Sequence, residues 1–88
     1  MNENKVVVTF FKSRNCPKCP KAEEVVKEVL KEFNGVELRE VFIEDNPEEA
    51  LMYQVVSTPS IAINDETIFF GEIPTREEFK RELERFLE

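Results

Sequence analysis

The sequence contains no histidine and no tryptophan, and it has only two cysteines and two glycines in 88 residues. A tetrahedral zinc or iron–sulfur site needs four ligands, so one chain with two cysteines and no histidine cannot complete a Cys/His site. No apolar run approaches the roughly 20 residues that a membrane-spanning helix needs. The absences therefore argue against a metal centre held within a single chain and against a membrane protein.

The charge balance is acidic, with a net charge of −7 from 19 acidic and 12 basic residues. Such a surface repels phosphate backbones and anionic lipids, so neither nucleic acid nor a membrane is an expected partner. The length predicts a single domain spanning residues 1–88, and the 41% hydrophobic content is typical of a folded one. The start of the chain, Met1-Asn2-Glu3-Asn4-Lys5, lacks a signal-peptide pattern, which predicts a cytoplasmic protein.

Apolar side chains recur in patterns that predict seven secondary-structure elements. Residues 6–11 are β-branched or aromatic without polar alternation, which is typical of a strand buried on both faces. From Cys16 the apolar spacing becomes helical and continues to Asn34-Gly35, where the glycine ends the helix. Further strands are predicted at 36–43, 61–63 and 67–70, and further helices at about 47–54 and after residue 75.

Both later helices begin with residues suited to capping. Asn46 is expected to cap the second helix, with Pro47 first in it and Glu49 completing a capping box. Thr75 and Glu78 have the same spacing before the last helix. The order βαβαββα predicts an α/β fold: a four-stranded mixed sheet with a parallel first pair, a closing hairpin and helices on both faces.

The two cysteines lie in Cys16-Pro17-Lys18-Cys19, where the first strand passes into the first helix. A helix starting at Pro17 would make Cys16 its N-cap, so free N–H groups and the helix dipole would favour the thiolate. Cys19, one turn further, is close enough for a disulfide and is the natural resolving thiol. Lys18 and Pro17, between the cysteines, are expected to modulate the pair. Pro20 lacks the N–H that the first turn would use, which predicts either an irregular first turn or a regular helix that begins somewhat later.

The short spacing makes a purely structural disulfide a poor explanation of the pair. Two interpretations remain open from the motif: a redox-active pair, or a dimer in which two chains each supply two cysteines to zinc or an iron–sulfur cluster.

A second signal is Thr58-Pro59, just before the third strand, followed by Gly71 after the hairpin. Together with Cys-Pro-x-Cys, this pattern resembles the thioredoxin-fold superfamily from about Val6 to the last helix, in particular the small glutaredoxin-like thioredoxins of prokaryotic or archaeal type. The resemblance implies a cis Thr58–Pro59 bond beside the cysteines. It also implies that the Thr58 backbone and Gly71 help to bind an extended substrate.

The resemblance further implies a thiol–disulfide oxidoreductase that reduces protein disulfides through Cys16 and Cys19. Its redox group would be the cysteine pair, with no other cofactor and no metal. Its partners would be disulfide-containing proteins and an electron donor, either a thioredoxin-reductase-type enzyme or another dithiol, and it would act as a monomer. Val56, Ile73 and Pro74 are expected to form an exposed apolar docking patch around Cys16.

Three positions depart from the families. Thioredoxins carry a buried Asp where this chain has Phe10 and a Trp where it has Asn15. Glutaredoxins bind glutathione through a Gly-Gly and a Cys-Asp or similar pair that is missing after Gly71. Glu40 is a candidate substitute for the missing Asp, although the simpler expectation is a solvated carboxylate or a partner of lysine. A glutathione-dependent glutaredoxin remains the alternative enzyme.

Overall fold

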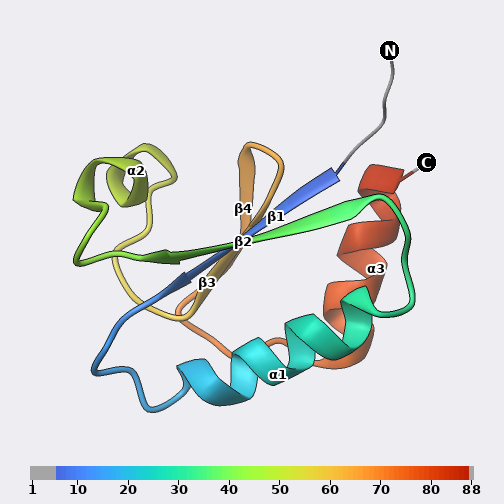
Figure 1. Ribbon diagram of the computed structural model, residues 1–88, viewed down its shortest axis with the longest axis horizontal. Coiled ribbons are helices and arrows are strands. Elements are labelled where there is room, and N and C mark those ends of the chain that lie inside the picture. The colour runs from blue at the N-terminus through green and yellow to red at the C-terminus, as the bar shows by residue number, and fades with distance from the viewer. Residues whose placement is uncertain (1–5, 88) are drawn as a thin grey trace.

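The computed structural model describes residues 6–87, so the expectation drawn from the first five residues lies outside the described part. The predicted order βαβαββα is confirmed (Figure 1). No helix within 6–87 has the length and apolarity needed to cross a membrane. The elements are β1 (Val6–Lys12), α1 (Cys19–Leu30), β2 (Val36–Phe42), α2 (Pro47–Met52), β3 (Ser60–Ile63), β4 (Glu66–Phe70) and α3 (Arg76–Leu87).

The four strands form one mixed sheet in the order β2-β1-β3-β4, as predicted. Strand β1 is parallel to β2, while β3 is antiparallel to both of its neighbours. Phe11 pairs with Ser60, and Ser60 pairs with Phe70. The end of β1, the start of β3 and the end of β4 therefore lie at the same end of the sheet, here called the exit end.

Two hydrophobic clusters occupy the two faces of the sheet. Helices α1 and α3 cover one face and α2 covers the other (Figure 1). Consecutive β1 residues serve both clusters, because Phe10 packs with α1 and α3 while Phe11 packs with α2 and both are fully buried. This explains why residues 6–11 show no polar alternation.

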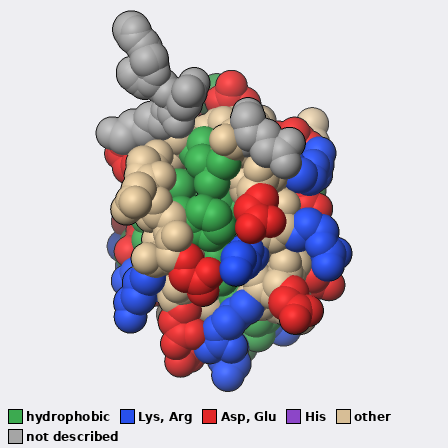
Figure 2. All heavy atoms as spheres, turned by 90° about the vertical axis from the view of Figure 1, so that its right-hand side faces the viewer, with side chains coloured by type: hydrophobic (Ala, Val, Ile, Leu, Met, Phe, Trp, Pro, Cys, Tyr) green, Lys and Arg blue, Asp and Glu red, His purple; other side chains and the backbone are tan. Residues whose placement is uncertain are grey.

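On the face drawn in Figure 2, acidic and basic side chains lie around a narrow apolar strip. Ion pairs join α3 to α1 and to the turn that follows α1: Arg76 pairs with Glu28 of α1, and Lys80 Nζ lies 3.0 Å from Oε1 of Glu32 in the turn. Each exposed pair of this kind contributes only about 0.2–1 kcal/mol. The glutamate-rich composition is thus accounted for mainly by solvated helix surfaces.

The two predicted capping boxes have different outcomes. At α3 the prediction is confirmed, since the Glu78 N–H donates to Thr75 Oγ1 at 3.0 Å and the Thr75 N–H donates to Glu78 Oε1 at 3.4 Å. At α2 it is wrong. The Asn46 amide donates back to the Phe42 carbonyl at 3.1 Å, and Glu49 forms an ion pair with Arg39 of β2 at 2.8 Å. Arg39 on β2 binds the Glu49 carboxylate, which the capping box would have paired with the Asn46 N–H.

Candidate functional site

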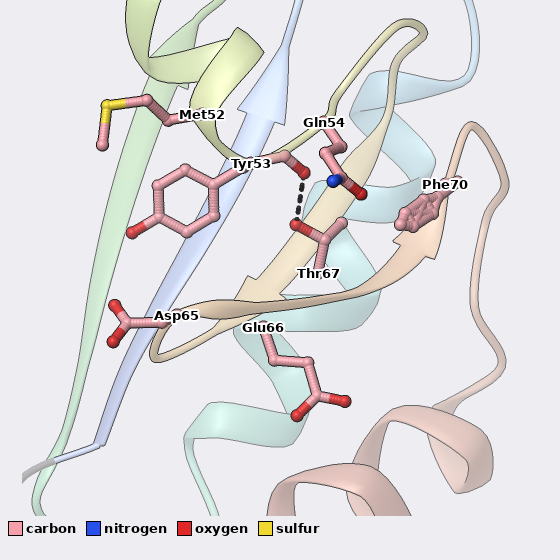
Figure 3. A pocket seen from close by; sticks show the side chains of 7 residues that line it. All are labelled: Met52, Tyr53, Gln54, Asp65, Glu66, Thr67 and Phe70. Atoms are coloured by element: carbon pink, nitrogen blue, oxygen red, sulfur yellow. Dashed lines mark hydrogen bonds between the residues drawn. The ribbon is translucent and has the colours of Figure 1, made fainter.

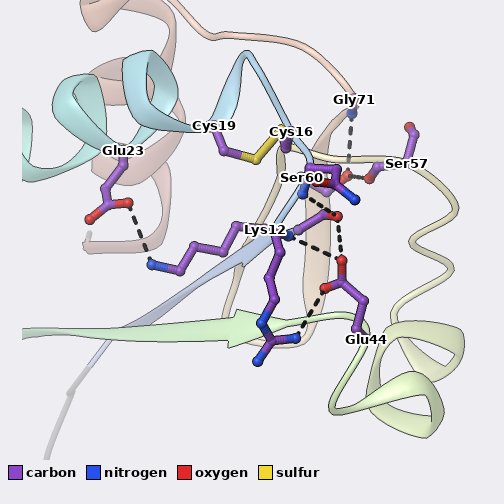
Figure 4. Close-up of a disulfide and its surroundings, with 11 residues drawn as sticks. Lys12, Cys16, Cys19, Glu23, Glu44, Ser57, Ser60 and Gly71 are labelled. Carbon is purple, nitrogen blue, oxygen red and sulfur yellow. Dashed lines mark hydrogen bonds and ion pairs between the residues drawn. A yellow bond between two sulfur atoms is a disulfide. The ribbon is translucent and has the colours of Figure 1, made fainter.

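Three segments that are distant in the sequence meet at the exit end of the sheet. The loop with Cys16 follows β1, Pro59 directly precedes β3, and Gly71 directly follows β4. The pairing of these strands brings all three segments to one place. Figure 4 shows the cysteines together with the turn that contains Ser57 and Ser60. The principal positions singled out in the sequence are therefore gathered in one region.

The two cysteines form a disulfide, with their Cα atoms 5.4 Å apart (Figure 4). Cys19 is only 4% exposed and belongs to the hydrophobic cluster beneath α1 and α3. Cys16 is half-buried and lies in the loop before the helix. The two cysteines thus differ in exposure, and Cys16 is the more exposed of the two.

Helix α1 begins at Cys19 with Lys18 as its N-cap, so the later start that Pro20 predicts is confirmed and the start at Pro17 does not occur. The Cys19 N–H donates to the Cys16 carbonyl at 3.3 Å, and the next bond runs from the Ala22 N–H to the Lys18 carbonyl at 3.1 Å. Pro20 therefore lies in the first turn, where its missing N–H leaves no helical bond unmade. Cys16 therefore lies outside the helix and is not its N-cap.

The residues between the cysteines are both exposed. Pro17 has no N–H to offer the Cys16 sulfur. The Lys18 side chain makes no hydrogen bond or ion pair within residues 6–87 and extends into solvent. Whatever Lys18 contributes electrostatically is therefore screened by water.

The loop before Cys16 is held by two carboxylates that the sequence did not single out. Glu44 Oε2 accepts from the Ser13 hydroxyl at 2.6 Å and from the Arg14 N–H at 3.1 Å. The Arg14 guanidinium lies 2.7 Å from Asp45 Oδ2. The Ser13 hydroxyl and the Arg14 N–H lower the pKa of Glu44 from its ordinary value. Since β1 and β2 are parallel, the loops that follow them are adjacent. The predicted parallel pairing could therefore have identified Glu44 and Asp45 as neighbours of the loop that contains Cys16.

The turn before β3 is tied to the end of β4 through one hydroxyl group. The Thr58–Pro59 bond is cis, as predicted, and Pro59 is buried. The buried Ser60 hydroxyl donates to the Ser57 carbonyl at 2.8 Å and accepts from the Gly71 N–H at 3.2 Å (Figure 4). Neither serine was singled out in the sequence, because only the register of β3 with β4 reveals their position.

Gly71 lies against this turn in a conformation that suits glycine. Its φ is +71°, and a Cβ atom there would lie 2.3 Å from Ser57 Oγ. Left-handed backbone of this kind is costly for other residues. Gly71 therefore allows the loop after β4 to approach Ser57 closely.

The simpler expectation for Glu40 is confirmed, because it pairs with lysines. Its carboxylate accepts from Lys12 Nζ at 2.6 Å and lies 3.4 Å from Lys27 Nζ. The Lys12 ammonium holds the pKa of Glu40 below its usual value. Lys12 also reaches Glu23 at 3.5 Å, so this network links β1, β2 and α1 (Figure 4). Phe10, at the position where thioredoxins carry a buried Asp, is fully buried.

The expected apolar patch is partly wrong. Val56 is 90% exposed and Ile73 is 37% exposed, but Pro74 is fully buried. The chain turns inward just before α3, which removes the apolar ring of Pro74 from water. The exposed apolar surface near the exit end is therefore formed without Pro74.

Comparison with known proteins agrees with this geometry. The thioredoxin domain family matches residues 4–84. A thioredoxin of Methanocaldococcus jannaschii is 39% identical over 75 residues, which cover 84% of this chain and 87% of the relative. A probable thioredoxin of Methanothermobacter thermautotrophicus is 40% identical over 74 residues, covering 83% and 86% respectively.

Among solved structures, a mutant thioredoxin from Halobacterium salinarum superposes with a TM-score of 0.80 at 24% identity, covering 97% of this chain and 77% of that one. The four-stranded mixed sheet with its flanking helices is thus the thioredoxin fold. With the family match and the archaeal relatives, the chain belongs to the thioredoxin family in its small archaeal form, and it is a thiol–disulfide oxidoreductase.

Proposed function

We propose that the protein reduces disulfide bonds of other proteins by dithiol exchange, with Cys16 as the attacking thiol and Cys19 as the resolving thiol. The observation that carries this assignment is the difference in access between the two bonded sulfurs. Cys16 is half-buried in a loop at the exit end, whereas Cys19 is 4% exposed and packed in the core. A bulky protein disulfide can reach only the accessible sulfur first.

The reaction proceeds in two exchanges. The Cys16 thiolate attacks one sulfur of the substrate disulfide, that bond breaks, and the departing substrate sulfur takes up a proton. Cys19 then loses its proton and attacks Cys16 Sγ, which forms the Cys16–Cys19 disulfide and releases the second substrate sulfur as a thiol after protonation. Two electrons have passed from the protein to the substrate, and a donor enzyme or dithiol returns them.

The substrate-binding part of the proposal uses Thr58, Pro59 and Gly71. An extended substrate segment beside Cys16 would pair with the backbone of Thr58, as peptides do when they add to exposed strand-like backbone. Thr58 is half-buried and precedes β3, and Gly71 carries no side chain that would obstruct the segment. Pro17 and Lys18 complete the site as residues that modulate the pair.

The partners in this proposal are disulfide-containing proteins and a reductase-type or dithiol electron donor. The working form is a monomer in the cytoplasm, a compartment in which protein thiols are kept reduced. The redox group is the cysteine pair itself. Gel filtration at micromolar concentration tests the monomer, and a peak at twice the expected mass would contradict it.

The assignment of the two cysteines is tested by a matched pair of variants. With dithiothreitol as donor, the wild type should reduce insulin disulfides and Cys16→Ser should not. Cys19→Ser should instead accumulate a mixed disulfide on Cys16, detected by mass spectrometry of the trapped adduct. Insulin reduction by Cys16→Ser at the wild-type rate would contradict the proposed attack by Cys16. A mixed disulfide trapped on Cys19 of Cys16→Ser would show that Cys19 is the attacking thiol. In a coupled assay with glutathione and its reductase we expect little turnover, which distinguishes the protein from a glutaredoxin.

A further inference from the structure

Four charged side chains, here called the charge ring, form a closed set of ion pairs: Lys12 of β1, Glu23 and Lys27 of α1, and Glu40 of β2. Glu40 accepts from Lys12 Nζ at 2.6 Å through one carboxylate oxygen, and its other oxygen lies 3.4 Å from Lys27 Nζ. Glu23 repeats this arrangement, at 3.5 Å from Lys12 Nζ and 2.7 Å from Lys27 Nζ. Each carboxylate therefore pairs with both lysines.

Lys12 is the inner lysine of the charge ring. Its side chain is 17% exposed, whereas that of Lys27 is 48% exposed. Every other lysine and arginine in residues 6–87 is also more exposed than Lys12. Hydrogen bonding to Glu40 raises the pKa of Lys12 above its ordinary 10.5, so the ammonium persists wherever thiols titrate. The protein thus holds a permanent positive charge in a position with little access to water.

The charge ring lies on the same side of the sheet as Cys19. Successive residues of β1 face opposite sides, so Lys12 shares the face of Phe10, which packs in one cluster with Cys19. Glu23 follows Cys19 by four residues in α1, which places both side chains on one face of the helix. Figure 4 accordingly shows Lys12 and Glu23 beside the disulfide. The most buried cation and the more buried cysteine therefore occupy the same region.

The remaining charged residues on the elements around the cysteines are exposed. They are Lys18 and Lys21 on α1, Arg14 and Glu44 in the loops after β1 and β2, Glu72 after β4, and Arg76 on α3. Water screens the fields of these groups, whereas a partly buried charge is screened much less. The two carboxylates of the charge ring also pair with Lys27, so they do not neutralise Lys12 alone.

A cation in this place has a use in the second exchange. The thiolate is the attacking species in disulfide exchange, so that step requires the charged form of Cys19. Cys19 packs in the cluster beneath α1 and α3, and apolar surroundings disfavour a thiolate. A fixed positive charge close to the sulfur offsets this effect.

We propose that the Lys12 ammonium favours the thiolate form of Cys19 during the second exchange. Glu23 and Glu40 hold the ammonium in place, and Lys12 is a positioning residue that acts on Cys19 through its charge. The Cys19 thiol gives its proton to water, its thiolate attacks Cys16 Sγ, and the bond from Cys16 to the substrate sulfur breaks. The substrate sulfur leaves with the electron pair and is then protonated, while Lys12 keeps its proton. The proposal rests on the function proposed for Cys16 and Cys19.

Dithionitrobenzoate, a small aromatic disulfide, separates the two exchanges. Attack by Cys16 releases one thionitrobenzoate, and attack by Cys19 on the mixed disulfide releases the second. Stopped-flow absorbance at equal concentrations of reduced protein and reagent gives both rates. Near neutral pH, Lys12→Met should slow the second release about three-fold and should change the first release less. A titration about one pH unit higher lowers the thiolate fraction about ten-fold, and each thiolate becomes about three-fold more nucleophilic.

Matched variants separate the charge of Lys12 from its structural role. Lys12→Arg keeps the charge, and Lys27→Met removes the outer lysine of the same charge ring, so both should retain a second release close to that of the wild type. At alkaline pH the second release in Lys12→Met should reach the wild-type rate, because the thiolate is then fully formed. Equal slowing by Lys12→Arg or Lys27→Met, or slowing that persists at alkaline pH, would overturn the proposal. Lys12→Gln gives the same test if Lys12→Met does not fold.

A direct titration of Cys19 provides a second measurement. In Cys16→Ser the chain has one thiol left, whose thiolate absorbs in the ultraviolet. Adding Lys12→Met should raise the midpoint by about one pH unit, and adding Lys27→Met should change it less. The single tyrosine, Tyr53, packs on the α2 side of the sheet beside a hollow of about 280 Å³ and gives the same background in every variant (Figure 3). A midpoint that Lys12→Met leaves unchanged would overturn the proposal.

The two releases also keep this proposal distinct from the proposed function. Absence of the first release in the wild type would refute the role proposed for Cys16. A normal first release, followed by a second release that Lys12→Met does not slow, would refute only the role of Lys12.

Discussion

Ser13 and Glu44 connect the loop after β1 to the loop after β2, with the serine hydroxyl 2.6 Å from the carboxylate oxygen that it donates to. The same oxygen accepts the Arg14 N–H at 3.1 Å. Because Cys16 follows only two residues after Arg14, the contact limits the conformations open to Cys16, the thiol proposed to attack the substrate. Glu44 is thus a positioning residue that acts on Cys16 through the loop and does not touch the reacting sulfurs.

The Glu44 contact should make stability depend on pH in one direction. The Ser13 hydroxyl and the Arg14 N–H lower the pKa of Glu44 in the folded protein below its ordinary 4.5. The carboxylate therefore stabilises the fold above the unfolded-state pKa, and this contribution is lost as pH falls through the folded one. The difference in free energy of unfolding between wild type and Glu44→Gln, measured by urea denaturation, should shrink on acidification. Glu48→Gln controls for the loss of one negative charge; a pH-independent difference for Glu44→Gln would contradict the prediction.

The ion pairs of Glu40 argue against a proton relay through its carboxyl group. Hydrogen bonding to Lys12 holds the pKa of Glu40 below its ordinary value of 4.5, so the carboxylate is a weak base near neutral pH and a poor acceptor for the Cys19 proton. Glu40→Gln should leave the midpoint of the pH–rate profile for Cys16 attack unchanged and should lower stability by about 0.5–1 kcal/mol. Stopped-flow rates across neutral pH check this. A displaced midpoint would restore Glu40 as a relay.

Adding a methyl group at Gly71 should cost stability for two reasons, the positive φ of the backbone and the close approach of Ser57. Gly35→Ala meets only the cost of its positive φ, about 1 kcal/mol, because nothing lies within 4 Å of its added Cβ. Gly71→Ala should lose more stability, since its Cβ would lie 2.3 Å from Ser57 Oγ. Combining it with Ser57→Ala should bring the loss close to that of Gly35→Ala. Thermal or urea unfolding of the three variants and the wild type tests this, and equal losses in both glycine variants would contradict it.

The buried hydroxyl of Ser60 satisfies two backbone groups at once. Ser60→Ala should leave the Ser57 carbonyl and the Gly71 N–H without a partner and cost about 1–3 kcal/mol. Thr67→Val removes a hydroxyl that serves only the Tyr53 carbonyl and should cost less. Urea denaturation compares the two. Insulin reduction should fall in Ser60→Ala more than in Thr67→Val, because Ser60 holds the turn beside the cysteines.

Most of the fold was predicted from sequence patterns that extend over only a few residues. The unbroken apolar run at 6–11, the helical spacing after Cys16 and the Thr75–Glu78 capping box each act over a few residues, so sequence alone predicted them. The cysteine pair and Thr58-Pro59 were found for the same reason. The N-cap position considered for Cys16 was wrong because Pro20 suits the first turn of a helix, and the helix begins so that Pro20 lies in that turn.

What the sequence did not reveal depends on strand register. Glu44 is adjacent to Ser13 only because β1 and β2 are parallel and in step, and Ser60 reaches Gly71 only because β3 pairs with β4. These contacts join residues far apart in the chain, and no short pattern encodes them.

The division of the interior into two clusters has a consequence for motion. The cluster beneath α2 is small and includes Ala50 and Ala62, whereas the cluster beneath α1 and α3 holds Phe10, Phe79 and Leu83. The smaller apolar cluster on the α2 side makes local opening there easier. Backbone amides of α2 should therefore exchange with deuterium sooner than those of β1 and β3. The α2 side of the molecule can therefore open locally while the half that contains Cys19 stays closed.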